Sequence, residues 1–316
     1  MAKHHHSNSN HGSTSRDLIL VTSHRDDFDR LAPLVLSLKR AGFCGSTVIF
    51  VSCMDAESVE KLRNHGVRVV PFHFADEHDF QRRARWWPLW RWFFSTRASV
   101  SQKNWLAHRV FHLRYLRYLL YEDFLQQRTV DFDRIMLADG RDVFFQADPF
   151  AWDWTPGVHF FLEDARQRIG TCRWHRQWLG YQFDASFIEQ NATRIPSCSG
   201  TTFGDTAGIR RYLEAMITTT MRARDLAKIS SGDQGIHNYI MIQNLLKDMV
   251  IHENRRGPVL TMGAMSETDC KMDASGAALN ENGEVVPVLH QYDRVPSLKE
   301  RFSRVCESSL SSVPND

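Results

Sequence analysis

The sequence predicts a single-domain α/β protein with a doubly wound, mostly parallel mixed sheet that is flanked by helices. Two observations support this fold class. Between residues 17 and 72, short apolar segments typical of buried strands alternate with segments of helical apolar spacing. A further apolar run at 135–138 ends abruptly in acidic residues, and in open α/β sheets ligands bind at such strand ends. A chain of 316 residues is long enough to bury a substantial core.

The N-terminal part of the chain predicts a β-α-β-α-β unit. Strands are expected at 17–24, 46–53 and 67–72, with helices at 28–41 and 56–65. The loop after the first strand then lies where a nucleotide base and ribose would dock. This loop consists of Thr22, Ser23, His24 and Arg25. No glycine-rich dinucleotide-binding or P-loop sequence follows the strand, which argues against a dinucleotide oxidoreductase or a P-loop NTPase.

Composition sets limits on the class of protein. With 42% hydrophobic residues, 24% charged residues and a net charge of +2, the chain gives no reason to expect nucleic-acid binding. No apolar run approaches the roughly 18 residues of a membrane span, so we expect a cytoplasmic protein that is soluble or peripheral to a membrane. The six cysteines lack metal-ligand spacing and are expected to be free thiols. Residues 1–16 resemble a tag or disordered leader. We expect residues 17–304 to form the folded domain and residues 305–316 to form a flexible tail.

Residues 82–94 have the most unusual composition, with four tryptophans and four arginines in thirteen positions. One interpretation is a lid whose indoles stack on sugar rings, and another is peripheral contact with an anionic membrane. The third is ordinary packing, with tryptophans inside and arginines outside. A helix is expected next, at 104–124. Of its arginines we assign Arg109 to the nucleotide site, although a solvated surface charge is the common alternative for Arg109, Arg114 and Arg117.

The central apolar strand leads into Asp139-Gly140-Arg141-Asp142, which places two carboxylates at the carboxyl end of a strand. Acidic oxygens on a turn at this edge of a sheet suit a hard divalent cation that carries phosphates. The strand predicted at 158–164 also ends in carboxylates, Glu163 and Asp164. That pair suits the orientation of an acceptor hydroxyl, but a solvated turn is the commoner role of such residues.

The C-terminal half adds further candidates. Gly200, beside Thr201, permits a close backbone approach to a ligand. After a helix predicted at 206–224, Asp233 stands near the start of another helix, where its alternative role is to cap that helix. The last apolar strand, predicted at 285–294, contains His290 followed by Arg294.

These segments resemble the nucleotide-sugar glycosyltransferases of the GT-A fold, particularly the glycogenin-like galactosyl- and glucosyltransferases and their bacterial relatives. The resemblance follows the element order over about 17–294. It is most specific in 139–150, which matches an Asp-x-Arg-Asp-Val-x-Phe-Gln-x-Asp-Pro-Phe variant of the Asp-x-Asp motif, in 199–204 with Asp233-Gln234, and at His290. The fold it implies is a GT-A, Rossmann-like sheet.

The resemblance also implies a metal site. Asp142 is expected to bind the ion directly, Asp139 to contact either the ion or the ribose, and His290 to complete the ligand set. Gly140, Arg141, Gly200 and Thr201 are then expected at the nucleotide-sugar. The spacing departs from a strict Asp-x-Asp motif, because Arg141 stands third and Asp142 fourth. His290 also lacks the Gly and Lys-Pro that follow it in the glycogenin group, so Arg294 is expected to supply the cationic phosphate contact.

The implied reaction transfers a hexose or pentose from a nucleoside-diphosphate sugar, with UDP favoured, to a saccharide or glycolipid acceptor such as a surface polysaccharide. Mn²⁺ is expected rather than Mg²⁺, because it tolerates mixed oxygen and imidazole ligands. Asp233 is the base candidate for an inverting enzyme. In a retaining one, Asp233 and Gln234 would position the acceptor and stabilise positive charge at the anomeric carbon. The competing classes are a metal-dependent phosphohydrolase or nucleotidyltransferase and a catalytically silent nucleotide-sugar-binding module.

Overall fold

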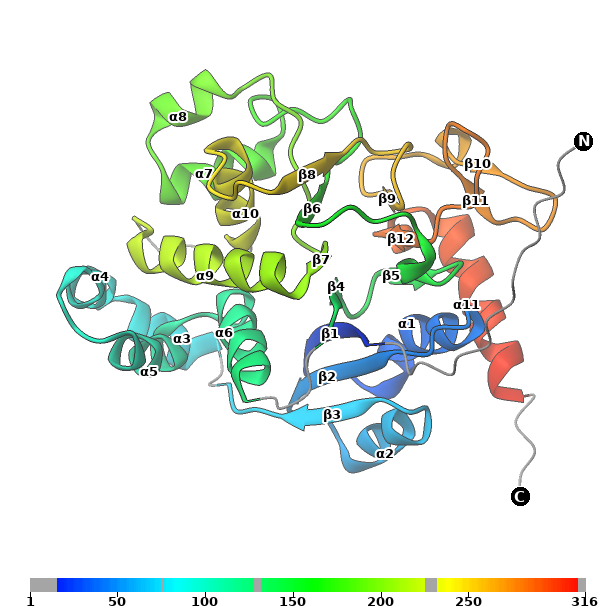
Figure 1. Ribbon diagram of the computed structural model, residues 1–316, viewed down its shortest axis with the longest axis horizontal. Helices are drawn as coiled ribbons and strands as arrows, with labels where there is room; N and C mark the ends of the chain where they lie inside the picture. Colours follow the sequence, from blue (N-terminus) through cyan, green and yellow to red (C-terminus); the bar gives the residue numbers. More distant parts are fainter. Residues whose placement is uncertain (1–15, 75–76, 128–131, 225–231, 312–316) are drawn as a thin grey trace, which may run out of the picture.

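The computed structural model describes residues 16–74, 77–127, 132–224 and 232–311 (Figure 1). The predicted leader thus lies outside the described residues except for Arg16. A seven-stranded sheet with the order β3-β2-β1-β4-β7-β6-β8 forms the centre of the molecule. Its strands are β1 (Asp17–His24), β2 (Ser46–Ser52), β3 (Arg68–Pro71), β4 (Arg134–Asp139), β6 (Val158–Phe161), β7 (Thr201–Asp205) and β8 (Met249–His252). Only β7 runs antiparallel to its neighbours, so the predicted mostly parallel mixed sheet is confirmed.

Helices cover both faces of this sheet, because successive strand residues point to opposite sides. Leu18 and Leu20 pack into the core on one face, whereas Ile19 and Val21 pack into the core on the other. The first face is covered by α4 (Trp87–Ser95), α5 (Val100–Val110), α6 (Leu113–Gln126), α9 (Thr206–Arg222) and α10 (Asp233–Ile242). The second face is covered by α1 (Phe28–Arg40), α2 (Ala56–Asn64) and α11 (Pro296–Ser311).

A second sheet of three strands, in the order β5-β12-β9, lies on the second face. Its strands are β5 (Val143–Phe145), β9 (Val259–Thr261) and β12 (Val288–His290). The last predicted apolar strand is β12, which therefore pairs outside the main sheet. Its antiparallel register places His290 opposite Val143, the residue that follows the acidic turn. This pairing brings the C-terminal histidine to the end of β4.

The helix predicted at 104–124 is wrong as a single element, because the chain forms α5 and α6 with a break between them. Phe111 has an extended backbone and is buried against Trp87, Phe94 and Tyr115. His112 then acts as the N-cap of α6. Burial of one aromatic ring therefore overrides the continuous helical pattern.

At the C-terminus, α11 extends past residue 305, and the flexibility expected of the tail from there onward stays a prediction. The helix is anchored earlier, where Phe302 stacks on Phe144 with 4.0 Å between ring centroids and packs edge-on against Tyr292. The remaining elements are α3 (Glu77–Ala84), α7 (Arg173–Gln182), α8 (Ala185–Gln190), β10 (Lys271–Met272), β11 (Ala278–Leu279), η1 (Pro149–Ala151), η2 (Glu267–Asp269) and η3 (Tyr292–Arg294).

Two predictions on environment can be compared with the described residues. The five cysteines whose side chains are described are all free, as expected. Within the described parts of the chain, no helix combines the length and the apolar character needed to cross a bilayer.

Candidate active site and metal centre

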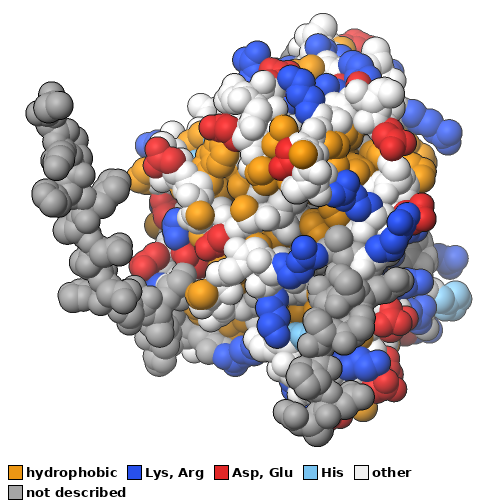
Figure 2. All heavy atoms as spheres, turned by 90° about the vertical axis from the view of Figure 1, so that its right-hand side faces the viewer, with side chains coloured by type: hydrophobic (Ala, Val, Ile, Leu, Met, Phe, Trp, Pro, Cys, Tyr) orange, Lys and Arg blue, Asp and Glu red, His pale blue; other side chains and the backbone are white. Residues whose placement is uncertain are grey.

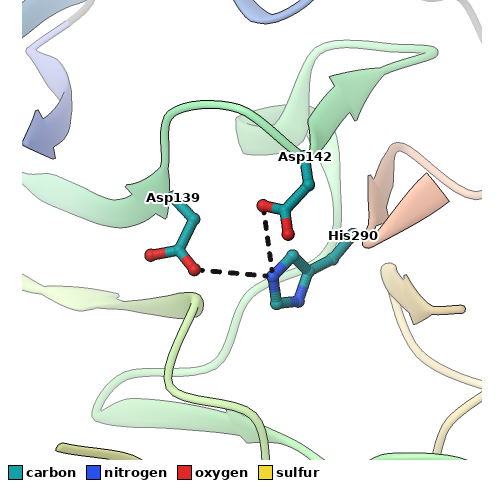
Figure 3. A group of neighbouring side chains, drawn as sticks. All are labelled: Asp139, Asp142 and His290. Carbon is teal, nitrogen blue, oxygen red and sulfur yellow. Dashed lines mark ion pairs between the residues drawn. The ribbon is translucent and has the colours of Figure 1, made fainter. Parts of the chain in front are cut away.

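The structure brings together the three residues that the sequence predicts as metal ligands (Figure 3). Asp139 is the last residue of β4, Asp142 lies in the following turn, and His290 ends β12. The Nε2 atom of His290 is 3.8 Å from Oδ2 of Asp139 and 3.8 Å from Oδ1 of Asp142. One ligand atom from each of the three residues lies within 4.8 Å of the others. The group therefore has a geometry in which a single cation can contact all three side chains.

The surroundings of His290 fit such an ion. Its side chain is fully buried, and within the described residues neither ring nitrogen has a hydrogen-bond partner. An unsatisfied buried polar group is costly and rare in native proteins. A divalent cation between the imidazole and the carboxylates removes that cost, and mixed nitrogen and oxygen ligands suit Mn²⁺ better than Mg²⁺.

Gly200 makes room for this group. A Cβ atom at position 200 would clash with Nε2 of His290 and lie 2.6 Å from Oδ2 of Asp139, well inside contact distance. Its carbonyl also accepts a hydrogen bond of 2.8 Å from the backbone N–H of Asp139. The close backbone approach predicted for Gly200 therefore exists, and it is an approach to the metal-ligand candidates themselves.

Electrostatics differ among the three side chains. For Asp139, burial alone would raise the pKa, but the guanidinium of Arg117 and the neighbouring His290 lower it. For Asp142, burial and then the charge of Asp139 raise the pKa. For His290, burial would lower the pKa, but Cys198 and the two carboxylates outweigh it and hold the pKa well above its ordinary value. A proton and a cation thus compete for this imidazole, and metal binding is expected to release a proton.

Arg117, on α6, links the metal-ligand candidates to the Asp233 carboxylate. Its Nη1 donates to Oδ1 of Asp139 over 2.5 Å, and its Nη2 donates to Oδ2 of Asp233 over 2.7 Å. The predicted nucleotide contact Arg109 is instead exposed on α5, with its guanidinium 3.8 Å from the ring centroid of Trp105. In the sequence, Arg117 is one of three arginines between residues 104 and 124, and nothing in the pattern distinguishes it from the other two. The break between α5 and α6 resets the helical phase, so no periodicity could single it out.

Asp233 does not act as a helix cap. Gly232 occupies the N-cap position of α10 without a side-chain capping bond, and Asp233 is the first helical residue. Its carboxylate accepts hydrogen bonds from Arg117 and, at 3.4 Å, from the hydroxyl of Tyr118. The burial of this carboxylate is therefore compensated by an ion pair rather than by the helix start.

Four hydrogen bonds of 2.8–2.9 Å fix the Gln234 side chain, in addition to a longer contact of 3.4 Å with His175. Its Oε1 accepts from the backbone N–H and the hydroxyl of Ser199, at 2.8 and 2.9 Å. Its Nε2 donates to Glu163 at 2.9 Å and to the carbonyl of Ser197 at 2.8 Å. Glu163 also lies 3.2 Å from Nε2 of His175. Burial would lower the pKa of His175, but Cys172 and Glu163 raise it to about 9, which favours the protonated imidazole at neutral pH.

Asp164, the second member of the predicted acidic pair, faces a different environment. Its carboxylate accepts hydrogen bonds from Arg166 at 2.7 Å and from Arg255 at 2.6 Å. Glu163 and Asp164 both line a cavity of about 470 Å³, together with Arg166 and Arg255. The structure therefore connects only Glu163 to Gln234 directly, while Asp164 organises the arginines of the adjoining cavity.

The predicted nucleotide loop lies at the same edge of the sheet as the acidic turn, because the register pairs Thr22 with Asp139. The hydroxyl of Thr22 donates to the Tyr121 hydroxyl at 2.9 Å, and Ser23 donates to Asp26 at 2.9 Å. Arg25 is exposed, with a left-handed backbone at φ 58°. Burial lowers the pKa of His24, which packs edge-on against Phe74.

The other predicted contacts are distributed around this edge. Arg141 is exposed and lies 3.9 Å from Asp26, and Arg294 is exposed on η3, near Asp293. Thr201 is buried at the start of β7. A Cβ atom at Gly140 would meet Leu31 at 2.8 Å, so that glycine is explained by packing against α1.

Comparisons with known proteins add information on the fold. No protein-family profile and no curated protein sequence matches the chain. Among solved structures, the galactosyltransferase LgtC in complex with donor and acceptor sugar analogs aligns with a TM-score of 0.50 and 14% identity, over 94% of this chain and 98% of that one. This chain has a GT-A-like fold.

Two further solved structures are similar to this GT-A-like chain. An active-site mutant of LgtC, in which a glutamine is replaced by glutamate, aligns with the same TM-score of 0.50, identity of 14% and coverage of 94% and 98%. The glycosyltransferase GlyE from Streptococcus pneumoniae TIGR4 aligns with a TM-score of 0.42 and 11% identity, over 77% of this chain and 46% of that one.

Proposed function

We propose that this chain is a metal-dependent glycosyltransferase that moves a hexose or pentose from a nucleoside-diphosphate sugar, with UDP favoured, to a saccharide or glycoconjugate acceptor. The observation that carries the proposal is the convergence of Asp139, Asp142 and His290 at the carboxyl end of a central strand in a GT-A-like sheet. The similar galactosyltransferase LgtC was solved with donor and acceptor sugar analogs, which supports a site for two sugars in this fold.

The three clustered side chains hold the cation, with Asp142 and His290 as direct ligands and Asp139 shared between the ion and Arg117. When bound, a divalent cation, Mn²⁺ in preference to Mg²⁺, neutralises charge on the diphosphate as the glycosidic bond breaks. Arg117 prevents Asp139 from turning away from His290, because the guanidinium occupies the other carboxylate oxygen. The ligand geometry is therefore set before donor arrives.

We assign the remaining contacts to the donor from the residues that lie near Asp139 at this edge of the sheet. The loop from Thr22 to Arg25 contacts base and ribose, since it lies beside Asp139. Gly200 allows the chain to pass close to the diphosphate and the sugar, because only a residue without a side chain fits against His290 and Asp139. The exposed Arg141 and Arg294 supply cationic contacts to phosphate, and both are long enough to move onto the donor.

Gln234 and Asp233 act on the transferred sugar and the acceptor. Gln234 is held by four hydrogen bonds, so its amide is pre-oriented and needs no reorganisation during the reaction. The LgtC variant in which an active-site glutamine becomes glutamate supports a role for such a residue, and we assign Gln234 as its counterpart. Asp233 is bound to Arg117, which favours its role in positioning and charge stabilisation over that of a base.

The acceptor binds in the cavity of about 470 Å³ that Glu163 lines. Carboxylates and guanidinium groups line it, and these groups recognise sugar hydroxyls by hydrogen bonds. Among the described lining residues, Glu163 is the one that accepts a hydrogen bond from Gln234, so it connects acceptor binding to the transfer site. Asp164 contributes indirectly, by holding Arg166 and Arg255 in place.

The test is release of nucleoside diphosphate from a panel of nucleotide-sugars in the presence of Mn²⁺, with and without saccharide acceptors. Acceptor-dependent release is expected, and Asp142→Asn should lower it by roughly a hundredfold or more. Asp29→Asn, an exposed acid on α1, is the matched control and should keep the parent rate. Release that is equal with and without every acceptor would identify a phosphohydrolase, and donor binding without turnover would identify a binding module.

A further inference from the structure

One stretch of the chain has a charge composition unlike the rest. From Phe80 to Tyr121 there are nine lysines and arginines and no aspartate or glutamate, although the whole chain carries a net charge of only +2. This stretch forms the end of α3, all of α4 and α5, and the start of α6. In Figure 1, α3, α4 and α5 lie together at one end of the molecule, opposite α11.

Helix α4 has apolar side chains on two faces, of which one is buried and the other is exposed. Trp87 and Phe94 are buried, and the indole N–H of Trp87 donates to the carbonyl of Ala223 at 3.0 Å. These contacts anchor the helix to the end of α9. The packing interpretation of the tryptophan-rich segment is therefore correct for its inner side only.

On the outer side, three large apolar side chains are exposed: Trp86 by 61%, Leu89 by 47% and Trp92 by 64%. They recur every three residues, which in a helix places them on neighbouring positions of one face, opposite Trp87 and Phe94. Trp105 on α5 is also 58% exposed. Exposed apolar side chains that group on one helix face, unlike scattered ones, indicate an interaction surface.

Cations precede this outer face along the chain. Arg85 immediately precedes Trp86, Arg82 lies near the end of α3, and both are exposed. Arg82 pairs with Asp79 at 2.7 Å, and beyond Asp79 no acid follows until Glu122. The contrast with the opposite end of the molecule is clear, since Figure 2 shows acidic and basic side chains interspersed there. We use the name outer α4 face for the exposed side chains of Trp86, Leu89 and Trp92 together with the two arginines that precede α4, Arg82 and Arg85.

We propose that the outer α4 face docks this protein onto the surface of an anionic lipid bilayer. Tryptophan is favoured at the headgroup level, where its ring is buried and its N–H stays hydrated. Arginines next to the indoles meet lipid phosphates, each contributing attraction that depends on anionic lipid and on salt. A second copy of this chain is a poor occupant, because a symmetric contact through the same face would oppose arginine to arginine. The proposal is independent of the reaction that the chain catalyses.

Co-sedimentation with vesicles tests the proposal, comparing pure phosphatidylcholine with phosphatidylcholine that contains phosphatidylglycerol. Binding is expected only to the anionic vesicles and should weaken as salt rises. The triple variant Trp86→Ser, Leu89→Ser, Trp92→Ser should lose binding by at least about tenfold, while Trp174→Ser, an equally exposed tryptophan on α7, should retain it. The double variant Arg82→Gln, Arg85→Gln should lose binding by roughly thirtyfold, and Arg63→Gln on α2 is its matched control.

Thermal melts of each variant separate a docking effect from unfolding, because the outer α4 side chains are exposed and should leave the melting temperature unchanged. The proposal is overturned if parent protein fails to bind anionic vesicles, or if it binds neutral vesicles equally well. It is also overturned if the triple variant binds as the parent does. A parent dimer that the triple variant converts to monomer, without vesicle binding, would assign the face to a second copy instead.

Discussion

His237 and His290 are both completely buried, yet their surroundings are opposite. His237, on α10, has both ring nitrogens hydrogen-bonded, Nε2 with the Ser197 hydroxyl at 2.9 Å and Nδ1 with the Tyr212 hydroxyl at 2.8 Å. It also stacks on Phe160, with 4.4 Å between ring centroids. His290 faces two carboxylates at 3.8 Å, and within the described residues its nitrogens have no hydrogen-bond partner.

This difference shows how a structural histidine is told from a ligand candidate. The bonds of His237 are complete without any further group, and burial, with a smaller effect of Arg117, lowers its pKa to about 3. Burial would lower the pKa of His290, but Cys198 and the nearby carboxylates raise it, and its unpaired nitrogens leave coordination capacity that the described residues do not use. Burial alone therefore does not tell a structural histidine from a candidate ligand, whereas the hydrogen bonds of the two ring nitrogens do.

Lowering the pH should decrease the free energy of unfolding because of His237. This is the largest effect that we predict. Its folded pKa of about 3 lies below the ordinary 6.5, so the unfolded chain takes up the proton first as pH falls. The contribution of neutral His237 to the free energy of unfolding is thus fully present above pH 6.5. It is lost toward pH 3 and amounts to on the order of 5 kcal/mol in total. His290, with a raised pKa, has the opposite sign: its contribution is present at low pH and lost as pH rises through the folded value.

The measurement is urea unfolding of the parent and of His237→Gln at pH 7 and pH 4.5. The stability difference between the two proteins should shrink by about half of the full effect at pH 4.5, because the variant has no imidazole to titrate. A difference that stays constant between the two pH values would contradict the neutral, structural role of His237.

Removing Arg117 is expected to have the next largest effect. Arg117→Met leaves Asp233 buried without its ionic partner, and breaking a buried pair in this way typically costs about 3–5 kcal/mol of unfolding free energy. Arg114→Met, an exposed neighbour on α6, should change stability by less than about 0.5 kcal/mol. Since Arg117 also helps to keep His237 neutral, the His237 pKa should rise in the variant, which NMR titration can follow.

Several parts of the site follow from local sequence pattern. The strand that ends at Asp139 and the N-terminal β-α-β-α-β unit are readable because apolar runs, turns and helix stops lie within short segments. The resemblance in the acidic turn then points to His290, although that residue lies far along the chain. What brings the distant histidine to the turn is the register that pairs Val143, next to Asp142, with His290.

Other parts of the site could not be predicted, because they depend on long-range packing. Arg117 points into the site only because Phe111 interrupts the helix before it. The four bonds of Gln234 come from segments that lie at least 35 residues away along the chain. The unusual composition of residues 82–94 can be seen in the sequence. Which tryptophans are buried, such as Trp87, and which are exposed, such as Trp86 and Trp92, depends on where α9 packs.

Loss of the His290 imidazole should reduce metal-dependent activity by roughly a hundredfold or more, equivalent to about 2.7 kcal/mol. Among the three clustered candidate ligands, His290 offers the nitrogen donor, and His290→Ala removes it while both carboxylates stay in place. A Mn²⁺ titration followed by thermal stabilisation measures the effect without relying on turnover, since a cation that binds the folded state raises its apparent stability. His237→Gln is the control and should keep the parent Mn²⁺ response despite its lower stability. Equal Mn²⁺ titrations for the parent and His290→Ala would assign His290 to packing.

Among the predicted variants of buried site residues, Gly200→Ala is expected to have the smallest effect, and it tests the surroundings of His290 by crowding the imidazole without removing it. The added methyl group would clash with Nε2 of His290 and lie 2.6 Å from Asp139, so the cluster must spread apart. Overpacking of this kind typically costs about 1–3 kcal/mol of unfolding free energy. Gly180→Ala on α7 is the matched control, because its nearest neighbour would lie at an ordinary 3.5 Å. Mn²⁺ affinity should fall by about tenfold or more in Gly200→Ala and remain unchanged in Gly180→Ala. Because His237 lies outside this contact, its acid titration should be the same in both variants, and a shift there would mean that the two histidine sites are not independent.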